Sequence, residues 1–526
     1  MMRNGRAGPA PGLPAAHESP WGDRMTTARF PAELLVKAGL PRAEAEGWAA
    51  EAGAWTAAAP SAEMEPPAAQ VPAPAAQLDS FPAAATPHDS FPAAAAGLSR
   101  FLARGQALAS QLPVPPARTS AQAAAGKAIA AALHGARDRF LRSHAAALYD
   151  TLTSGCTRPL RLYELVDAAA ARVPGLAPSP AEMAAERARA LADKVGAELA
   201  IGLLLAHLLA LPRAGRHLVT AMLRPTPAAL GRLGELQAAG TVSLGPVRVT
   251  RRGRAGVLEL SNPTHLNAED ATTLGATEAA VDLILLDPAI EVGVFRGGVV
   301  EHPRYRGRRV FGSGINLTHL YHGRIDYLFY LVRDMGYVNK IYRGVLPDGG
   351  CPGPGPAGIE PDTIEKLWIA AVEEFAIGGA CQLLHVADHV IAGRGARLFL
   401  PARREGIIPG ASNLRLPRFV GDRAARQAIL SGREWIAGEP DAALLCDEVV
   451  EPAEMDQAVA ARAEALTSSG LVNAAANRRT LRVGQEPLET FREYMATYAR
   501  EQVRCHLSPA LVGNLEQHWQ ARDRSL

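Results

Sequence analysis

The chain has 526 residues, which exceeds one ordinary domain and predicts two to four structured units. Its 55 lysines and arginines nearly balance 53 aspartates and glutamates, so a net charge of +2 argues against a general nucleic-acid binder. The five cysteines form no CxxC pair, and no run of 18 apolar residues occurs. These features argue against a disulfide framework, a structural zinc site and a membrane span. We therefore expect a cytoplasmic protein that binds neither nucleic acid nor membrane.

The N-terminal stretch, residues 1–97, is expected to be a disordered extension. Residues 56–97 are dominated by alanine and proline, and the heptapeptide DSFPAAA occurs at 79–85 and again at 89–95. So few large apolar side chains cannot offset the entropy lost when a chain becomes ordered. Two short copies also do not make a repeat architecture.

Residues 98–240 have helical patterning and predict an all-helical N-terminal domain. Within it, Ser179-Pro180-Ala181-Glu182 is typical of a capping box with proline at the first helical position. The run that follows places apolar residues on one helical face, at Leu191, Val195, Leu199 and Leu203, with His207 in line. Such a stripe favours a packing or oligomerisation element.

In residues 241–452, strands alternate with helices, which predicts an α/β domain with right-handed crossovers. The expected elements are a hairpin over 247–261, a helix over 268–286, a strand over 290–298, a strand and turn over 308–317, a helix over 320–335, a strand over 367–377, a helix from Gly379, and short strands over 389–393 and 396–401. Residues 453–526 return to helical patterning and form the expected C-terminal segment.

Two turns of small residues could carry chemistry. One leads through Gly312-Ser313-Gly314 into Ile315, and the other through Gly378 into Gly379. Each is preceded by a strand and followed by a helix, so each leaves a backbone N–H free. Two such N–H groups that converge on one point form an oxyanion hole. Either turn alone could be purely structural, whereas the pair in one α/β domain favours a site.

Five motifs within 242–452 follow one another in a fixed order: SNPTHLNAEDATTL, DPAIEVGVFRG, VFGSGINL, EFAIGGACQLLHVADHVIA and LPARREGIIPGASNLRLPRFVG. This set resembles the crotonase (enoyl-CoA hydratase/isomerase) superfamily. The resemblance implies an α/β fold with a crotonase-like ββα-superhelix core, to which this chain adds a helical N-terminal domain and a helical C-terminal segment. It also implies a coenzyme A thioester substrate and a homo-oligomer, either trimer or hexamer.

Carried over by motif, Ile315 and Gly379 would supply the two oxyanion N–H groups. The remaining residues that the resemblance places at the thioester or the adenine are His265, Leu266, Ala268, Ser313, Gly314, Asn316, Leu317 and Gly378. The basic loop that contains His302, Arg304 and Tyr305 suits the phosphates of coenzyme A, although an ordinary surface loop is the alternative.

The chain departs from the hydratase pattern at both acid/base positions. Hydratases of this superfamily carry one glutamate just after the second oxyanion turn and another about twenty residues later. Here the first position is Gln382 and the second matches Ala402, while Glu405 lies three residues too late. An amide or a methyl group cannot shuttle a proton. The site is therefore expected to stabilise an enolate without hydrating a double bond.

The segment from 298 to 344 and the added helical domain resemble one branch of the superfamily. This branch contains the cofactor-independent dioxygenases that act on (3,5-dihydroxyphenyl)acetyl-CoA in glycopeptide-antibiotic pathways. The resemblance implies that O2 and the thioester are the substrates, that (3,5-dihydroxyphenyl)glyoxylate and free coenzyme A are the products, and that no metal or organic cofactor takes part. Gln382 would then be a neutral group beside an apolar O2 pocket.

Several roles stay open at this point. Glu269 is either a helix-start carboxylate or a partner for substrate phenol groups, and Arg333 is either solvated or an active-site cation. A hydrolase or isomerase with Glu269 as base, and a non-catalytic acyl-CoA-binding protein, are the alternative functions. His385, Asp388 and His389 imitate metal-ligand spacing, but their side chains are expected to diverge, so no metal site is predicted.

Overall fold

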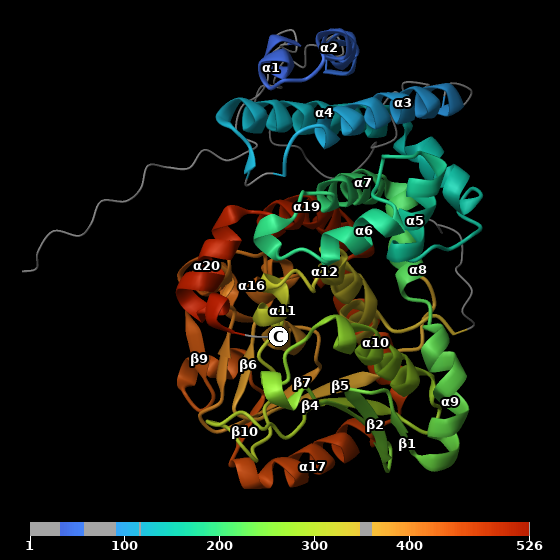
Figure 1. Ribbon diagram of the computed structural model, residues 1–526. Helices are drawn as coiled ribbons and strands as arrows, with labels where there is room; N and C mark the ends of the chain where they lie inside the picture. The colour runs from blue at the N-terminus through green and yellow to red at the C-terminus, as the bar shows by residue number, and fades with distance from the viewer. Residues whose placement is uncertain (1–31, 57–90, 115–116, 348–359, 525) are drawn as a thin grey trace, which may run out of the picture. The chain divides into compact units, whose positions relative to one another are not determined.

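The computed structural model describes residues 32–56, 91–114, 117–347, 360–524 and 526 (Figure 1). The chain falls into two compact units. One comprises the described residues before 84 together with Arg100–Arg139, and the other comprises those of Ala84–Ser99 and Phe140–Leu526. The helical region expected over 98–240 is thus divided between the two units. Its second part belongs to the same unit as the β-sheets.

The first unit contains helices where the sequence analysis expected a disordered extension. These are α1 (Ala32–Lys37) and α2 (Arg42–Thr56). Helix α3 (Phe91–Ser110) also starts within 1–97, although its residues before Arg100 belong to the second unit, so the expectation is wrong for these parts of 1–97. Within this unit the ring of Trp48 stacks on that of Phe101, with 5.1 Å between centroids, and its indole N–H donates to the Phe101 carbonyl. Residues 1–31 and 57–90 lie outside the described residues.

The helical part of the second unit precedes the sheets in sequence. It contains α4 (Ser120–Thr153, from residue 140 on), α5 (Leu162–Arg172), α6 (Pro180–Arg187), α7 (Glu198–Ala210), α8 (Pro212–Met222) and α9 (Pro227–Ala239). The capping box is confirmed, because Ser179 accepts from the N–H of Glu182, whose side chain reaches back. The prediction that one helix carries an apolar stripe from Leu191 to Leu203 is wrong, because α6 ends at Arg187 and Val195 is 59% exposed.

No single helix among the described residues is both long and apolar enough to span a membrane. One bent pair, α7 with the stretch Pro212–Ala239, passes that test by length and composition only, with an angle of 109° between its halves.

A seven-stranded sheet forms the centre of the second unit. Its strands lie in the order β1 (Thr241–Ser243), β2 (Val247–Arg252), β3 (Ala255–Leu260), β4 (Val292–Gly297), β5 (Leu367–Val372), β7 (His389–Gly393) and β10 (Glu448–Val450). The first three pair antiparallel, and β3 to β10 pair parallel. The predicted hairpin and the α/β class are confirmed. Helices connect the parallel strands, as such crossovers require.

Helices cover both faces of this sheet (Figure 1). On one face, Val292, Ile369 and Ile391 pack with Met455 of α17 (Met455–Thr467). On the other lies α10 (Ala271–Leu286), which approaches β3 so closely that Gly256 has no room for a Cβ beside Ile284. Both faces of the parallel strands are therefore buried, which accounts for their nearly continuous apolar sequences.

A second, three-stranded sheet holds the turn that leads to Gly379. It contains β6 (Phe375–Ile377), β8 (Arg397–Phe399) and β9 (Glu434–Ile436). In sequence, α14 (Gly379–Leu384) lies between β6 and β8, and α15 (Ala402–Glu405) and α16 (Ser412–Arg426) lie between β8 and β9. The strand expected over 308–317 is wrong, because that stretch pairs only through isolated bridges such as Gly312 with Ala376. The helix expected over 320–335 is also interrupted.

The interruption separates α11 (Leu317–Tyr321) from α12 (Leu328–Arg333). A π-helical turn over Asp334–Val338 then leads to α13 (Asn339–Arg343). Such turns widen a helix locally and often occur at functional sites.

Three helices of the C-terminal segment, α18 (Leu471–Gln485), α19 (Leu488–His506) and α20 (Pro509–Trp519), return to the core. Glu486, fully buried between α18 and α19, accepts from Arg415 at 2.9 Å and from Arg418 at 2.8 Å. Burial opposes the charge of Glu486, but these arginines and Arg343 lower its pKa to about 2. This ion cluster binds the last helices to α16.

One glycine decides how closely the segment before Ile315 can approach the main sheet. A Cβ on Gly297, at the end of β4, would lie 1.7 Å from the carbonyl oxygen of Val310. Asn267 also ties the two segments, because its side-chain amide donates to Gly298 and to Val310.

We expect Gly297→Ala to lower the free energy of unfolding by about 3 kcal/mol, since the backbone of 310–311 must move away. The matched control is Gly275→Ala on α10, where a Cβ meets nothing within 4 Å. It should instead raise stability by about 0.5–1 kcal/mol. Urea denaturation followed by circular dichroism measures both. Equal effects of the two substitutions would contradict the close approach.

Candidate active site

The two predicted turns meet. A Cβ on Gly314 would lie 3.0 Å from the backbone nitrogen of Gly379 and 2.8 Å from the carbonyl oxygen of Ile377. The Gly314 turn is fixed by Glu269, whose N–H donates to Gly314 and whose carbonyl accepts from Asn316, both at 2.7 Å. Glycine is therefore required at 314, where φ is +81°.

The backbone N–H groups of Ile315 and Gly379 are both free. Neither donates to any residue in the described part of the chain. For Ile315 the reason is the parallel bridge with Glu269, which uses the groups on either side of it. For Gly379 the reason is its place as the first residue of α14. Both residues line one internal pocket. Two free donors at one cavity wall are what an oxyanion hole requires.

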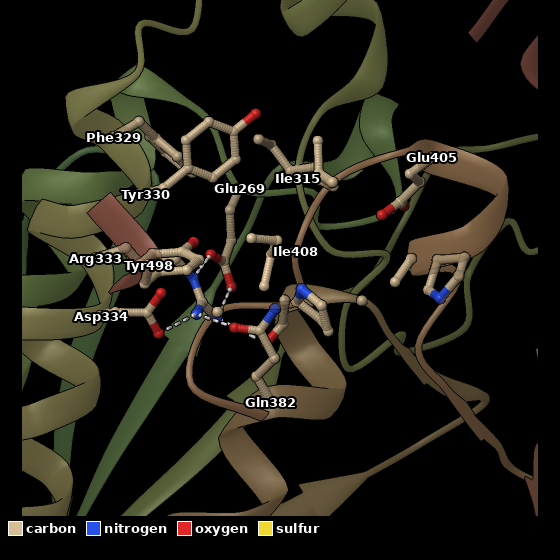
Figure 2. A pocket seen from close by; sticks show the side chains of 17 residues that line it. Glu269, Ile315, Phe329, Tyr330, Arg333, Asp334, Gln382, Glu405, Ile408 and Tyr498 are labelled. Atoms are coloured by element: carbon tan, nitrogen blue, oxygen red, sulfur yellow. Dashed lines mark hydrogen bonds and ion pairs between the residues drawn. The ribbon is translucent and has the colours of Figure 1, made fainter. Parts of the chain in front are cut away.

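Figure 2 shows this pocket from close by. Of the residues predicted for the site, it is lined by Glu269, Ile315, Arg333, Gly378, Gly379 and Gln382. The structure thus brings all five predicted catalytic residues together, from segments up to 113 residues apart, since 382 − 269 = 113.

Arg333 organises the polar side of the pocket. It donates to both carboxylate oxygens of Glu269, to the Gln382 side-chain oxygen at 2.8 Å and to the Gly379 carbonyl at 2.7 Å. Tyr337 donates a further hydrogen bond to Glu269 at 2.9 Å. Burial would lower the pKa of Arg333, but the charge of Glu269 raises it above its usual value. The guanidinium therefore stays charged although it is 4% exposed.

Two alternatives from the sequence are settled by this network. Arg333 is buried, so a solvated position for it is wrong. Glu269 is not the carboxylate at the start of α10, because Asp270 is the N-cap and accepts from the N–H of Thr272. Glu269 faces the pocket instead.

The charges around position 382 explain why this residue is an amide and not a carboxylate. A Cβ on Gly410 would touch both the Gln382 oxygen, at 2.5 Å, and the carboxylate of Asp334, at 2.7 Å, so these groups lie close together. Burial raises the pKa of Asp334, against the opposing charges of Arg333 and Arg415. A glutamate at 382 would put a third carboxylate beside Arg333. An amide accepts the same hydrogen bond without that charge.

Glu405 enters the same pocket from α15. Because residues three apart on a helix share a face, Glu405 lies on the side of α15 that carries Ala402, and both line the cavity. Sequence analysis placed Glu405 outside the site because it lies three residues after the expected position, and this interpretation is wrong. Burial raises the pKa of Glu405 to about 7.

The residues predicted for coenzyme A lie outside this cavity, apart from Gly378. Ser313 donates to the carbonyl of His265 at 3.1 Å, which joins the two segments expected at the adenine and the thioester. Asn316 caps α11, since its side chain accepts from the N–H of His319 and donates to Asp270. Ala268 is buried, and Leu266, with φ of +54°, packs against the cluster of Val300, Val310 and Phe375, while Leu317 begins α11.

The loop that carries His302, Arg304 and Tyr305 is held by its aromatic residue. Tyr305 packs edge-on against Phe375, with 5.3 Å between centroids, and Arg304 lies over the tyrosine ring. The His302 ring lies 6.0 Å from that of Tyr305. Arg304 itself is exposed. An anchored loop with an exposed cation is compatible with phosphate contacts.

The histidine–carboxylate motif after α14 does not converge. His385 is buried and bonds Ser412 at 3.1 Å, and burial lowers its pKa to about 3. Asp388 instead accepts from the N–H of Trp368 and from Arg478. His389 lies beside Asp447 and Glu448. The expected divergence of the three side chains is confirmed.

Several pocket residues were not predicted. Besides Ala402 and Glu405, they are Phe329, Tyr330, Asp334, Pro401, Tyr498 and the Ile407–Gly410 stretch. Tyr498 comes from α19, more than a hundred residues after Gln382, and only the fold brings it to the site. Asp334 directly follows Arg333 in the sequence and could have been considered for the site, but no sequence signal indicates that it is buried.

The Arg333–Glu269 pair should be strongly coupled. We expect Glu269→Gln and Arg333→Met each to lower the free energy of unfolding by about 3–5 kcal/mol, because each leaves one buried charge unpaired. The double variant should lose less than the sum, by about 0.5–3 kcal/mol. A denaturation cycle on the exposed pair Arg42–Glu46 is the control, with an expected coupling of about 0.3–0.5 kcal/mol. Additive losses at 269 and 333 would contradict the network.

Comparison with known proteins gives a consistent assignment. Residues 361–499 match the family model described as Enoyl-CoA hydratase/isomerase. A (3,5-dihydroxyphenyl)acetyl-CoA 1,2-dioxygenase of Amycolatopsis orientalis is 48% identical over 406 residues, which is 77% of this chain and 91% of that protein. A probable enoyl-CoA hydratase of Rhizobium meliloti is 29% identical over 42% of this chain and 76% of that protein.

A crystal structure of an enoyl-CoA hydratase from Mycobacterium avium subsp. paratuberculosis is also similar, with 18% identity and a TM-score of 0.42. The match covers 54% of this chain and 99% of that chain. The α/β core with added helical segments before and after it is confirmed by the order of the strands and helices. Because this chain covers 91% of a relative that is 48% identical to it, the chain belongs to the enoyl-CoA hydratase/isomerase (crotonase) superfamily.

Proposed function

We propose that this protein converts (3,5-dihydroxyphenyl)acetyl-CoA and O2 into (3,5-dihydroxyphenyl)glyoxylate and free coenzyme A. The observation that carries the proposal is the pair of free N–H groups, Ile315 and Gly379, in a pocket whose hydratase acid/base positions hold Gln382 and Ala402. Such a pocket can hold a thioester enolate, but the usual pair that adds water is missing. The 48% identity to a dioxygenase for this thioester supports the same reaction.

The polar side of the pocket suits the hydroxyl groups of the aromatic ring. Glu269, Arg333 and Gln382 present carboxylate, guanidinium and amide groups whose positions are fixed by one another. A phenol can donate to a carboxylate and accept from a guanidinium. We therefore assign ring recognition to this network and thioester recognition to the two N–H groups.

We also propose that the reaction needs no metal or organic cofactor. Ground-state O2 is a triplet, so it accepts one electron from a substrate that can donate one. An arylacetyl thioester becomes such a donor when its α-carbanion is spread over the ring and the carbonyl. The substrate radical and the superoxide recombine through a new C–O bond, and the resulting peroxide attacks the thioester carbonyl, so that coenzyme A leaves as the thiolate. Loss of the second α-hydrogen as a proton then breaks the O–O bond, which leaves the ketone and carboxylate oxygens of the glyoxylate. A role in glycopeptide-antibiotic biosynthesis, through dihydroxyphenylglycine, fits this product.

A hydrolase or isomerase with Glu269 as base is the alternative enzyme. It is less well supported, because Arg333 and Tyr337 already donate to the Glu269 carboxylate. A cytoplasmic location and assembly into trimers or hexamers stay predictions. Sedimentation velocity measures the assembly.

The proposed reaction is tested with an oxygen electrode. We expect the purified protein to consume one O2 per coenzyme A released from (3,5-dihydroxyphenyl)acetyl-CoA, and to keep this activity after exhaustive chelation. Coenzyme A release without O2, with arylacetate as product, would instead identify a hydrolase. Binding without turnover would identify an acyl-CoA-binding protein. Activity that is lost on chelation and restored by iron or copper would contradict cofactor independence.

The second oxyanion donor is tested with Gly379→Val. A Cβ at this position would lie 3.2 Å from Arg333 Nη2 and 3.4 Å from the Glu269 carboxylate, so the larger valine side chain must displace either the turn or the Arg333–Glu269 pair. We expect turnover to fall by about 10²–10³-fold, the usual effect of losing one oxyanion donor. Circular dichroism should be unchanged.

The control for this substitution is Gly231→Val on α9, where a Cβ meets nothing within 4 Å. It should leave turnover unchanged. Near-normal rates in Gly379→Val would mean that this turn has only a structural role.

A further inference from the structure

Oxidation of an arylacetyl thioester begins with the loss of an α-proton, and the pocket must supply a base for it. Three carboxylates line the cavity: Glu269, Asp334 and Glu405. They differ in what already surrounds them. This difference singles out one of them.

Glu269 and Asp334 belong to the Arg333 network. Glu269 accepts from Arg333 through both oxygens and from Tyr337. Asp334 lies 3.8 Å from Arg333 and accepts from the N–H of Ala411. Both carboxylates therefore already have hydrogen-bond or charge partners, which stabilise their ionised forms and leave them poor proton acceptors.

Glu405 stands on the other side of the pocket. In Figure 2, Ile315 and Ile408 lie between its carboxylate and the Glu269–Arg333 pair. Its side chain makes no hydrogen bond or ion pair with any residue in the described ranges, although Glu405 is only 6% exposed. A buried carboxylate without a partner is rare in folded proteins, because burial of an unpaired charge is costly. Such a group is a candidate for chemistry.

The position of Glu405 fits an α-proton. A Cβ on Gly378 would lie 3.9 Å from its Oε1 atom, so the carboxylate faces the turn that presents the Gly379 N–H. The α-carbon of a thioester is attached to the carbon that carries the carbonyl oxygen. When that oxygen accepts from Ile315 and Gly379, the α-carbon is two bonds away from it, beside the turn that the Glu405 carboxylate faces.

Resting on the proposed function, we propose that Glu405 is the general base that removes the α-proton of the arylacetyl thioester. The Cα–H bond breaks, an O–H bond forms on the Glu405 carboxylate, and the electron pair moves into the thioester oxygen held by Ile315 and Gly379. The net reaction removes both α-hydrogens. One leaves on the thiol of coenzyme A and the other goes to solvent, so Glu405 ends each turnover ionised.

The ionisable groups around Glu405 leave it well suited to this step. Burial raises its pKa to about 7, near the pH at which a base must act. Tyr330 of α12 faces it, and burial together with the Glu405 charge raises the pKa of that tyrosine. From α19 comes Tyr498, whose pKa burial also raises. Neither phenol is ionised at neutral pH.

Other neighbouring elements add no cation to the Glu405 side chain within the described part of the chain. Arg403 and Arg404, on α15 itself, are exposed. The π-helical turn Gln427–Ser431 carries no ionisable side chain. On α20, Glu516 accepts from Tyr321 and Arg522, and His518 is exposed.

The proposal is tested by α-hydrogen exchange without O2. Protein and (3,5-dihydroxyphenyl)acetyl-CoA are mixed in D2O under argon, and deuterium at the α-carbon is followed by mass spectrometry. We expect exchange by the unaltered protein, with a rate that rises with pH and levels off above about 7. Glu405→Gln should slow exchange at least about 100-fold, the usual contribution of a general base. Its dissociation constant for the thioester should change less than threefold.

Glu405→Asp keeps a carboxylate on a shorter side chain and should retain part of the exchange, with a pH profile of the same shape. Glu464→Gln, an exposed glutamate on α17, is the matched surface control and should exchange normally. Exchange by Glu405→Gln within tenfold of the unaltered protein would overturn the proposal. So would a pH profile that Glu405→Gln leaves unchanged.

Stability gives a second readout. The folded-state pKa of Glu405, about 7, lies above its unfolded value of about 4.3, so the stability linked to this group is lost as pH rises through about 7. Most of this loss falls between about pH 4.3 and pH 7, so the melting temperature of the unaltered protein should fall relative to that of Glu405→Gln between pH 5 and pH 7. A difference in melting temperature between the two proteins that does not change with pH would contradict a buried, unpaired carboxylate at Glu405.

Measuring O2 consumption in air tests the dioxygenase reaction separately from the role of Glu405. Exchange that depends on Glu405 but is accompanied by no O2 consumption in air would support the base and refute the dioxygenase. Rapid O2 consumption by both the unaltered protein and Glu405→Gln would support the dioxygenase and refute the base.

Discussion

The buried guanidinium of Arg333 is the interaction on which the site depends. It joins the loop before α10, through Glu269, to the second oxyanion turn, through Gly379 and Gln382. A charged group removed from water is costly unless every donor finds a partner. Each of these contacts therefore constrains the position of the others. The same hydrogen bonds that satisfy Arg333 also hold the Gly379 N–H toward the cavity.

This arrangement divides the pocket into two chemical environments. On one side, charges and hydrogen bonds are paired, which suits recognition of a polar ring. On the other, Glu405 lies with apolar side chains such as Ile315 and Ile408, at the place proposed for the thioester. A negative charge that forms there meets the two N–H groups, while the charge of Arg333 behind the Gly379 turn is already paired with Glu269. Low polarity beside a developing charge strengthens those two hydrogen bonds.

The sequence predicted the parts of this structure whose signals are local. Period-two alternation located the hairpin of β2 and β3, and the glycines before Ile315 and Gly379 marked both turns. The helices over 32–56 were not predicted, because the disorder expected for 1–97 was argued from the alanine- and proline-rich composition of 56–97, which does not extend to them, and the burial of Trp48 that stabilises them arises only in the fold. Glu405 was placed outside the site because it lies three residues after the expected position. Residues three apart on a helix share a face, so Glu405 reaches the pocket from α15 beside Ala402. Tyr498 could not be found, since its proximity to Gln382 comes only from tertiary packing.

The packing of α19 on α7 has a consequence for how the protein is made. Val503 and Ala499 fit closely against Gly202, where no Cβ has room, and Tyr327 donates to the Ala499 carbonyl. The same helix brings Tyr498 to the pocket. All other elements that line the pocket precede α19 in the order of synthesis. A nascent chain can therefore form its sheets early, but its pocket stays open to water until this helix docks, so reactive intermediates cannot be confined before that point.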